Sequence, residues 1–199
     1  MKDLSKRKFF DEEAFGWDEP NHPEDKVQIQ KLVERFELKS GDWVLDIGTG
    51  KGILLPYLSP QVKNRGKVVA LDFSWNMISQ ASAINKRKNI CFVNASVEAL
   101  PIKDQKIDCI TCLDTFAHVC AQKEAMREMG RVLRKGGRLY VAHSLGKKEV
   151  ASFHKKVGGA VEHDTLPSDS MMKKIMQSVG LKEIKIVDHP DLYLARARK

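Results

Sequence analysis

The sequence lacks long apolar runs and has few cysteines. None of its apolar stretches approaches the ~20 residues that a membrane-spanning helix needs. The first residues, Met1–Lys8, lack the apolar core of a secretion signal. Four cysteines occur among 199 residues, and we interpret them as free thiols of a reducing compartment. We therefore expect a cytoplasmic protein without a membrane span.

Patterns that bind metal are also missing. Cys109 and Cys112 form a C-x-x-C pair, but they lie inside an apolar run, 107–113, that is predicted to be a strand. Residues three apart on a strand point to opposite faces of the sheet, so the two thiols cannot readily share a metal ion. The six histidines include no H-x-x-x-H spacing. We expect no metal site.

The balance of charge is basic. The 34 Lys and Arg residues exceed the 26 Asp and Glu residues, which gives a formal net charge of +8. Such a charge admits an anionic or nucleic-acid partner. However, the basic residues come as scattered doublets with little aromatic interleaving, which is typical of solvated helix faces. We do not expect a nucleic-acid partner, and we interpret residues 1–199 as one α/β domain.

The most informative stretch is a glycine-rich turn. Residues 43–47 form a short apolar run that suits a buried parallel strand, and glycines follow at every second position, 48, 50 and 52. Glycine allows a sharp turn and lets a ligand approach the backbone. In open α/β sheets, ligands bind beyond the carboxyl ends of the strands. This turn is therefore the expected floor of a site.

The spacing of these glycines excludes two common nucleotide loops. A dinucleotide fingerprint, G-x-G-x-x-G, would need its third glycine one residue later than Gly52. A Walker P-loop ending at Gly50-Lys51 would need glycine in place of Leu45 and a hydroxyl side chain at position 52. Neither loop fits.

The D-x-G-x-G-x-G pattern of Asp46 to Gly52 instead resembles motif I of the class I S-adenosylmethionine (SAM)-dependent methyltransferases. The next predicted strand, 67–72, ends in an acid 20 residues after Gly52, and Asp72 to Met77 resembles the D-x-S-x-x-M stretch of the family. Further landmarks follow in the family's order, namely E-A-L-P at 98–101, a fourth strand at 107–113 and R-V-L-R-K-G-G at 131–137. The resemblance is strongest over residues 40–145.

The resemblance implies a Rossmann-like three-layer α/β sandwich. Its mostly parallel seven-stranded sheet would have the order 3-2-1-4-5-7-6, with strand 7 antiparallel. The periodicity of the sequence agrees with this fold, because Ile29, Leu32, Val33 and Phe36 form the apolar stripe of a helix that begins at Pro23. Strands are predicted at 90–93 and 138–143, helices at 74–85, 122–133 and from Ser168 to Gly180, and a closing hairpin at 181–187 and 192–197.

The resemblance also implies SAM as cofactor and a set of residues that bind it. Asp72 would accept hydrogen bonds from both ribose hydroxyls, and Asp46 would anchor the glycine turn. The family usually places an acid before E-x-L-P to contact adenine, whereas this chain has Ser96 there, so the expected bond lacks charge assistance. The cofactor-binding residues that we expect are Asp46, Gly48, Thr49, Gly50, Asp72, Phe73, Met77, Ser96, Val97 and Leu113.

The acceptor side is predicted from residues that leave strands four and five. Asp114 and His118 follow the fourth strand and His143 ends the fifth, so these three are the candidate catalytic residues. A neutral imidazole can remove a proton from a hydroxyl, amine or thiol acceptor. By strand alternation, His143 shares the side of Leu139 and Val141 and can be a buried histidine, which favours His118 as the base. His154 and His163 lie in a predicted insertion, 144–168, near the site.

The aromatic-rich beginning of the chain, within residues 1–22, resembles the lead-in of many small-molecule methyltransferases, where it folds over the cofactor as a lid. A terminal helix packed on the sheet is the alternative; apart from it, we expect the first regular element at Pro23. The function that we predict is methyl transfer from SAM to a small-molecule acceptor by a monomer or homodimer. The alternatives are an RNA or protein methyltransferase and a non-catalytic SAM-binding module.

Overall fold

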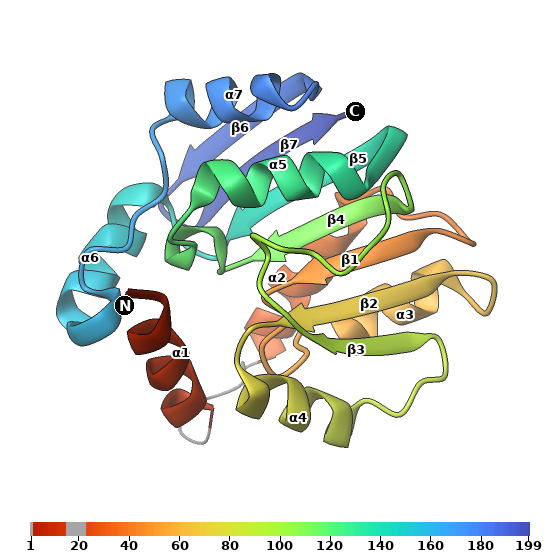
Figure 1. The fold of residues 1–199 in the computed structure, drawn as a ribbon, viewed down its shortest axis with the longest axis horizontal. Coiled ribbons are helices and arrows are strands. Elements are labelled where there is room, and N and C mark those ends of the chain that lie inside the picture. The colour runs from red at the N-terminus through yellow and green to blue at the C-terminus, as the bar shows by residue number, and fades with distance from the viewer. Residues whose placement is uncertain (1, 15–22) are drawn as a thin grey trace.

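The computed structural model describes residues 2–14 and 23–199, and within them seven strands form one sheet (Figure 1). In chain order the strands are β1 (Trp43–Ile47), β2 (Lys67–Asp72), β3 (Ile90–Asn94), β4 (Ile107–Leu113), β5 (Leu133–His143), β6 (Lys182–His189) and β7 (Leu192–Arg198). Their order across the sheet is β3-β2-β1-β4-β5-β7-β6. Strand β7 is antiparallel to β5 and β6, and the other pairs are parallel. The predicted fold is confirmed.

Helices connect the strands and form the outer layers. They are α1 (Lys2–Glu13), α2 (Pro23–Glu34), α3 (Leu55–Val62), α4 (Trp75–Ile84), η1 (Phe116–His118), α5 (Gln122–Val132), α6 (Lys147–Val157), η2 (Gly159–Val161) and α7 (Asp169–Ser178). Helices α5 and α7 pack on one face of the sheet, while α2 and α3 pack on the other. The hydroxyls of Ser74 and Ser168 cap α4 and α7, as their sequences predict.

The two core clusters show that the predicted side-chain alternation is correct. Leu32 and Val33 of α2, and Phe36 just beyond its end, are buried against one face of the sheet, with Cys109 in the same cluster. Cys112 belongs to the cluster on the opposite face. The two thiols therefore point away from each other and are free. No helix in the described ranges is long and apolar enough to cross a membrane.

Two boundaries differ from the expectation. Residues 2–13 form α1, so regular structure begins before Pro23, as in the terminal-helix alternative, but the helix packs against α4 and η2 rather than on the sheet. Strand β5 begins at Leu133 instead of residue 138, because Leu133 pairs with Ile107 before a register shift near Cys109. The R-V-L-R-K-G-G landmark therefore runs into the strand instead of preceding it.

The carboxyl edge of the parallel strands is covered by helices from distant parts of the chain. Figure 1 shows α1 between α6 and α4, beside the arrowheads of β2 and β4. The glycine turn follows β1 and the Asp114–His118 segment follows β4, so both lie at this same edge. Helix α1 thus lies at the edge of the sheet where the site is predicted.

Candidate active site

The glycine turn after β1 is shaped by backbone angles that favour glycine. Gly48 has φ +65°, and a Cβ at this position would lie 2.1 Å from the hydroxyl of Thr115, which packs onto the turn. Gly50 has φ +54°, and its Cβ position is open, with no atom within 4 Å. Gly48 therefore lets the segment after β4 approach the turn, and Gly50 leaves room for a ligand against the backbone.

Asp46 anchors this turn from inside the sheet. Its carboxylate accepts hydrogen bonds from the hydroxyls of Thr49 (2.7 Å) and Thr111 on β4 (2.8 Å). Burial raises the pKa of Asp46 to about 6, although both hydrogen bonds oppose the shift. Asp46 therefore fixes the turn to two strands, as its position in the sequence predicts.

Asp72, the last residue of β2, faces the turn. Its two carboxylate oxygens accept hydrogen bonds from the backbone N–H groups of Gly50 and Ser74, each at 2.9 Å. Burial raises the pKa of Asp72 to about 6 against these bonds, and the nearby Asp11 carboxylate adds to the shift. Each oxygen keeps a lone pair beyond the bond it accepts. The carboxylate can therefore still accept from two hydroxyls of a ligand.

The remaining predicted cofactor residues follow β2 or β3, lie on α4 or end β4. Phe73 directly follows Asp72, Met77 is buried on α4, Val97 is buried after β3, and Leu113 ends β4. The hydroxyl of Ser96 donates to Glu98, two residues further on. The carboxylate beside Ser96 is that of Glu98, which belongs to the E-A-L-P landmark.

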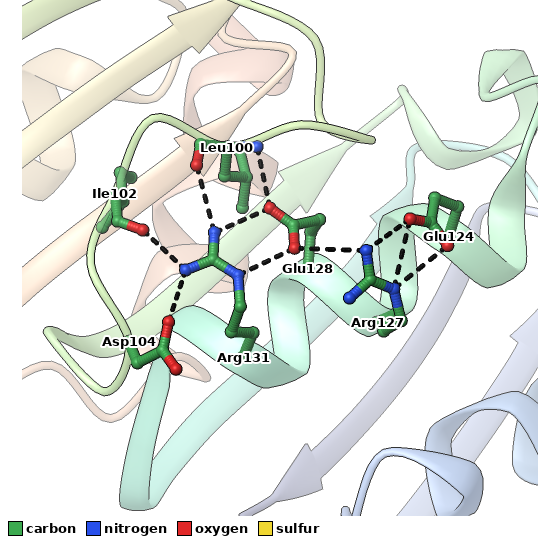
Figure 2. A network of polar contacts seen from close by, with 7 residues as sticks. All are labelled: Leu100, Ile102, Asp104, Glu124, Arg127, Glu128 and Arg131. Atoms are coloured by element: carbon green, nitrogen blue, oxygen red, sulfur yellow. Dashed lines mark hydrogen bonds and ion pairs between the residues drawn. The ribbon is translucent and has the colours of Figure 1, made fainter.

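The segment after β3 is held in place by charged side chains of α5 (Figure 2). Glu128 accepts from the backbone N–H of Leu100 (2.9 Å), and Arg131 donates to the carbonyl oxygens of Leu100 (3.1 Å) and Ile102 (2.8 Å). Glu128 and Arg131 also pair with each other at 2.7 Å. This network satisfies the backbone of the segment that carries Ser96 and Val97 and fixes that segment to the core.

On the acceptor side, His118 at the end of η1 is paired with Asp164. Its Nδ1 lies 2.8 Å from one Asp164 oxygen, and the ammonium of Lys6 on α1 lies 2.5 Å from the other. Burial favours the neutral acid, but the hydrogen bonds from His118 and Lys6 outweigh it and lower the pKa of Asp164 below its ordinary value. Burial lowers the pKa of His118 despite its bond to Asp164. His118 is therefore neutral near pH 7.

The tautomer of His118 follows from this pairing. An ionised carboxylate only accepts hydrogen bonds, so Nδ1 of His118 carries the proton that points at Asp164. The lone pair of the neutral ring then lies on Nε2. A histidine oriented by a buried carboxylate in this way is arranged to take up a proton.

His143 and Asp114 occupy a different environment. His143 is buried, and its Nε2 has no hydrogen-bond partner among the described residues; its Nδ1 lies 3.5 Å from an oxygen of Asp114. Burial lowers the pKa of His143 to about 3, with His118 and His154 adding to the shift. Asp114 has φ +48°, and its exposed side chain accepts from the N–H of Ser144 at 2.7 Å. His143 is thus neutral and a weak base.

The two histidines of the 144–168 segment separate in the structure. His154 on α6 is buried with its ring 4.6 Å from that of His118, and its Nδ1 contacts the carbonyl oxygen of Asp164 at 2.7 Å. His163 is exposed, whereas His118, His143 and His154 lie near one another, so the expected convergence holds for three of the four histidines. Within residues 2–14 and 23–199, no group of His, Cys, Asp and Glu side chains is arranged to hold a metal ion.

Helix α1 spans both halves of the site. The ring of Phe10 lies 5.7 Å from that of Phe73 on the cofactor side and 5.0 Å from that of His118 on the acceptor side. Asp11 accepts from the hydroxyl of Ser74 at 2.6 Å. Trp17, which belongs to the predicted lid, lies outside the described residues.

Sequence reasoning missed three residues that complete the site, Lys6, Thr111 and Asp164. Thr111 could have been found, because its position on β4 opposite Asp46 follows from the predicted strand order. Lys6 and Asp164 are 158 residues apart, and no local pattern links them.

The arrangement of these residues fits SAM. The open space at Gly50 suits close backbone contact with a ligand, and Asp72 offers a carboxylate to ribose hydroxyls. The buried apolar side chains of Met77 and Val97 suit an adenine ring.

Comparisons with known proteins agree with this geometry. The model of the methyltransferase domain family matches residues 45–141. The ubiquinone/menaquinone biosynthesis C-methyltransferase UbiE of Enterobacter sp. (strain 638) is 30% identical over 188 residues, which cover 79% of this chain and 75% of that protein. The UbiE protein of Salmonella newport is 30% identical over 187 residues, covering 78% and 74%.

Solved structures share the fold. A SAM-dependent methyltransferase from Aquifex aeolicus superposes with a TM-score of 0.75 at 26% identity, covering 94% of this chain and 97% of that one. A methyltransferase of Haloferax volcanii, solved with the activator Trm112, has a TM-score of 0.73 at 19% identity, covering 95% and 96%, and shows the fold alone. The predicted function, SAM-dependent methylation of a small molecule, is confirmed. The chain belongs to the class I SAM-dependent methyltransferases.

Proposed function

We propose that the acceptor is a hydroxylated aromatic ring of the hydroquinone class, methylated on a ring carbon, with His118 as the base. The observation that carries the proposal is the buried pair of His118 and Asp164 beside the carboxyl edge, with Nδ1 and carboxylate 2.8 Å apart. The UbiE relatives, which are named as C-methyltransferases of ubiquinone and menaquinone biosynthesis, support carbon as the acceptor atom.

The residues of the acceptor half suit this chemistry. A phenolic hydroxyl that gives its proton to Nε2 of His118 leaves negative charge on the ring, and the neighbouring ring carbon becomes nucleophilic. SAM, when bound, supplies an electrophilic methyl group on a sulfonium. Asp164 stabilises the imidazolium of His118 until the proton returns to the oxygen, as the substituted carbon releases its own proton to water. Phe10, whose ring lies 5.0 Å from that of His118, offers aromatic surface to a planar acceptor.

We assign the other predicted residues to the cofactor half and to positioning. Gly48, Thr49 and Gly50 form the floor, Asp46 holds them, and Asp72 binds the ribose. Phe73, Met77, Ser96, Val97 and Leu113 enclose the adenine and the adjacent part of the cofactor. His143 and Asp114 are not bases in this proposal, because His143 is too weak a base and Asp114 is held by the backbone of Ser144.

Residues 1–199 act as one domain, as a monomer or homodimer, without a nucleic-acid partner. The four free thiols, Cys91, Cys109, Cys112 and Cys120, support a cytoplasmic location, since such thiols are usual in a reducing compartment.

The test uses SAM that is isotopically labelled at its methyl group and a panel of acceptors, namely naphthohydroquinone, a monohydric phenol, histamine and bulk RNA. We expect labelled product from naphthohydroquinone, with the methyl group on carbon by NMR and its formation lost in His118→Gln. Methylation of oxygen would contradict the carbon acceptor. Preferential labelling of RNA would favour the nucleic-acid alternative, and bound SAM with no product from any acceptor would favour a non-catalytic module.

A further inference from the structure

Lys6 places a charged group of the N-terminal helix inside the acceptor half of the site. Its side chain is buried, with 9% of its surface exposed. Its ammonium donates to the Asp164 carboxylate at 2.5 Å and to the carbonyl oxygen of His118 at 2.8 Å. A buried ammonium is stable only when it is paired and hydrogen-bonded. Both partners of Lys6 belong to the pair that carries the proposed base.

Asp164 is held from two sides. The Nδ1 of His154 on α6 contacts its backbone carbonyl oxygen at 2.7 Å, which fixes the main chain. Its side chain has one oxygen on Lys6 and the other on His118. Lys6 therefore restricts the rotation of the carboxylate, and with it the orientation of the His118 ring.

The opposite end of α1 is attached to the cofactor half. One carboxylate oxygen of Asp11 accepts from the hydroxyl of Ser74 at 2.6 Å and from the N–H of Asn76 at 3.2 Å. The carbonyl oxygen of Ala14 accepts from the side-chain amide of Gln80 at 2.9 Å. Ser74 itself donates its N–H to Asp72. One helix thus connects the residue beside the ribose to the residue beside the acceptor.

We propose that Lys6 is a positioning residue for methyl transfer: when α1 docks over the cofactor edge, Lys6 binds Asp164 and thereby orients His118 as the base. The inference rests on the proposed function, in which His118 removes the acceptor's proton. Before α1 docks, Asp164 lacks its second cation and can turn away from the ring. The base is therefore assembled only when the cofactor half is closed, and an acceptor in an open site is not deprotonated.

The charges around His118 give this role a signature that a packing role lacks. Lys6 from α1, His154 from α6, His143 from β5 and Asp164 from the 162–168 segment face the ring. The positive charge of Lys6 opposes protonation of His118, whereas Asp164 favours it. Removing Lys6 should raise the pKa of His118, and removing the charge of Asp164 should lower it.

The experiment compares Lys6→Met with Lys6→Arg, which keeps the charge, and with Lys8→Met as the matched control. Lys8 lies on the same helix with its side chain 77% exposed. With naphthohydroquinone as the probe, we expect Lys6→Met to lower kcat about 10- to 100-fold with little change in SAM affinity. The acid limb of the pH–rate profile of Lys6→Met should move to higher pH, because the pKa of His118 rises. Lys6→Arg should recover most of the rate, and Lys8→Met should match the wild type.

A double-mutant cycle tests whether Lys6 acts through Asp164. Lys6→Met combined with Asp164→Asn should be no slower than Asp164→Asn alone. Wild-type turnover in Lys6→Met, or additive losses in the double variant, would overturn the proposal while leaving His118 as the base. If naphthohydroquinone is not methylated at all, the role of Lys6 can still be tested by NMR titration of His118 in the complex with S-adenosylhomocysteine (SAH). An equal pKa of His118 in wild type and Lys6→Met would overturn that role.

Discussion

The ionisation of Asp72 should control the affinity for the cofactor. Burial raises its pKa to about 6, so the carboxylate of the free protein gains its charge only as the pH rises through this value. Ribose hydroxyls donate to the carboxylate and favour its charged form. We therefore expect the affinity for SAH to fall as the pH decreases below about 6, by up to tenfold per pH unit.

The magnitude follows from the contacts of the carboxylate. Each oxygen already accepts one backbone N–H, from Gly50 or Ser74, and has capacity for one hydroxyl. A hydrogen bond to a charged group contributes about 1.5–3 kcal/mol, so the loss of even one ribose contact weakens binding roughly tenfold or more. Asp72→Asn should show this loss above about pH 7 and should lose most of the pH dependence.

The measurement is isothermal titration calorimetry with SAH from about pH 5 to 8. Asp46 also has a pKa of about 6, and the difference between wild type and Asp72→Asn separates the two carboxylates. Asp114→Asn is the control, because Asp114 lies at the end of β4 on the acceptor side and should leave SAH affinity unchanged. Equal affinity of wild type and Asp72→Asn at every pH would refute the assignment of Asp72 to the ribose.

Four other predictions can be tested separately. His118→Gln should reduce turnover of the acceptor by roughly 10²–10⁴ at unchanged SAH affinity; full turnover would remove His118 as the base. Hydrogen exchange in residues 5–14 should slow when SAH binds, and equal protection would argue for a permanently packed helix. The pKa of His143 is about 3 in the folded protein and about 6.5 in an unfolded chain. Below about pH 6.5 the unfolded state therefore takes up a proton that the folded state does not, and the protein loses stability. Denaturation should show wild type losing ~1.4 kcal/mol per pH unit below that value relative to His143→Gln, and parallel curves would contradict it. Glu128→Gln should cost about 1.5–3 kcal/mol of unfolding free energy, whereas the exposed Glu124→Gln should leave the unfolding free energy nearly unchanged.

The cofactor half could be predicted from the sequence because its signals are local. Short apolar runs identified β1, β2 and β4, and the glycine turn and Asp72 lie at the ends of two of those strands. The strand order then places Thr111 beside Asp46. In this half, residues that act together are close in sequence or lie on paired strands.

The acceptor half could not be predicted in the same way. Helix α1 has no strong apolar stripe, and its docking depends on a buried ammonium whose partner, Asp164, follows α6. The contact between Asp164 and His118 depends on how residues 144–168 fold, which no periodicity specifies. Choosing His118 over His143 from strand alternation agrees with their environments, since His143 is buried with a pKa of about 3.

We expect His118 to be neutral, held by ionised Asp164 and ready to accept a proton. Nitrogen NMR of the His118 side chain in the SAH complex, from about pH 5 to 8, measures its protonation state and tautomer. We expect a neutral ring near pH 7 with its proton on Nδ1 and a pKa below about 6.5. A proton on Nε2 in the neutral ring, or titration above about 6.5, would contradict it.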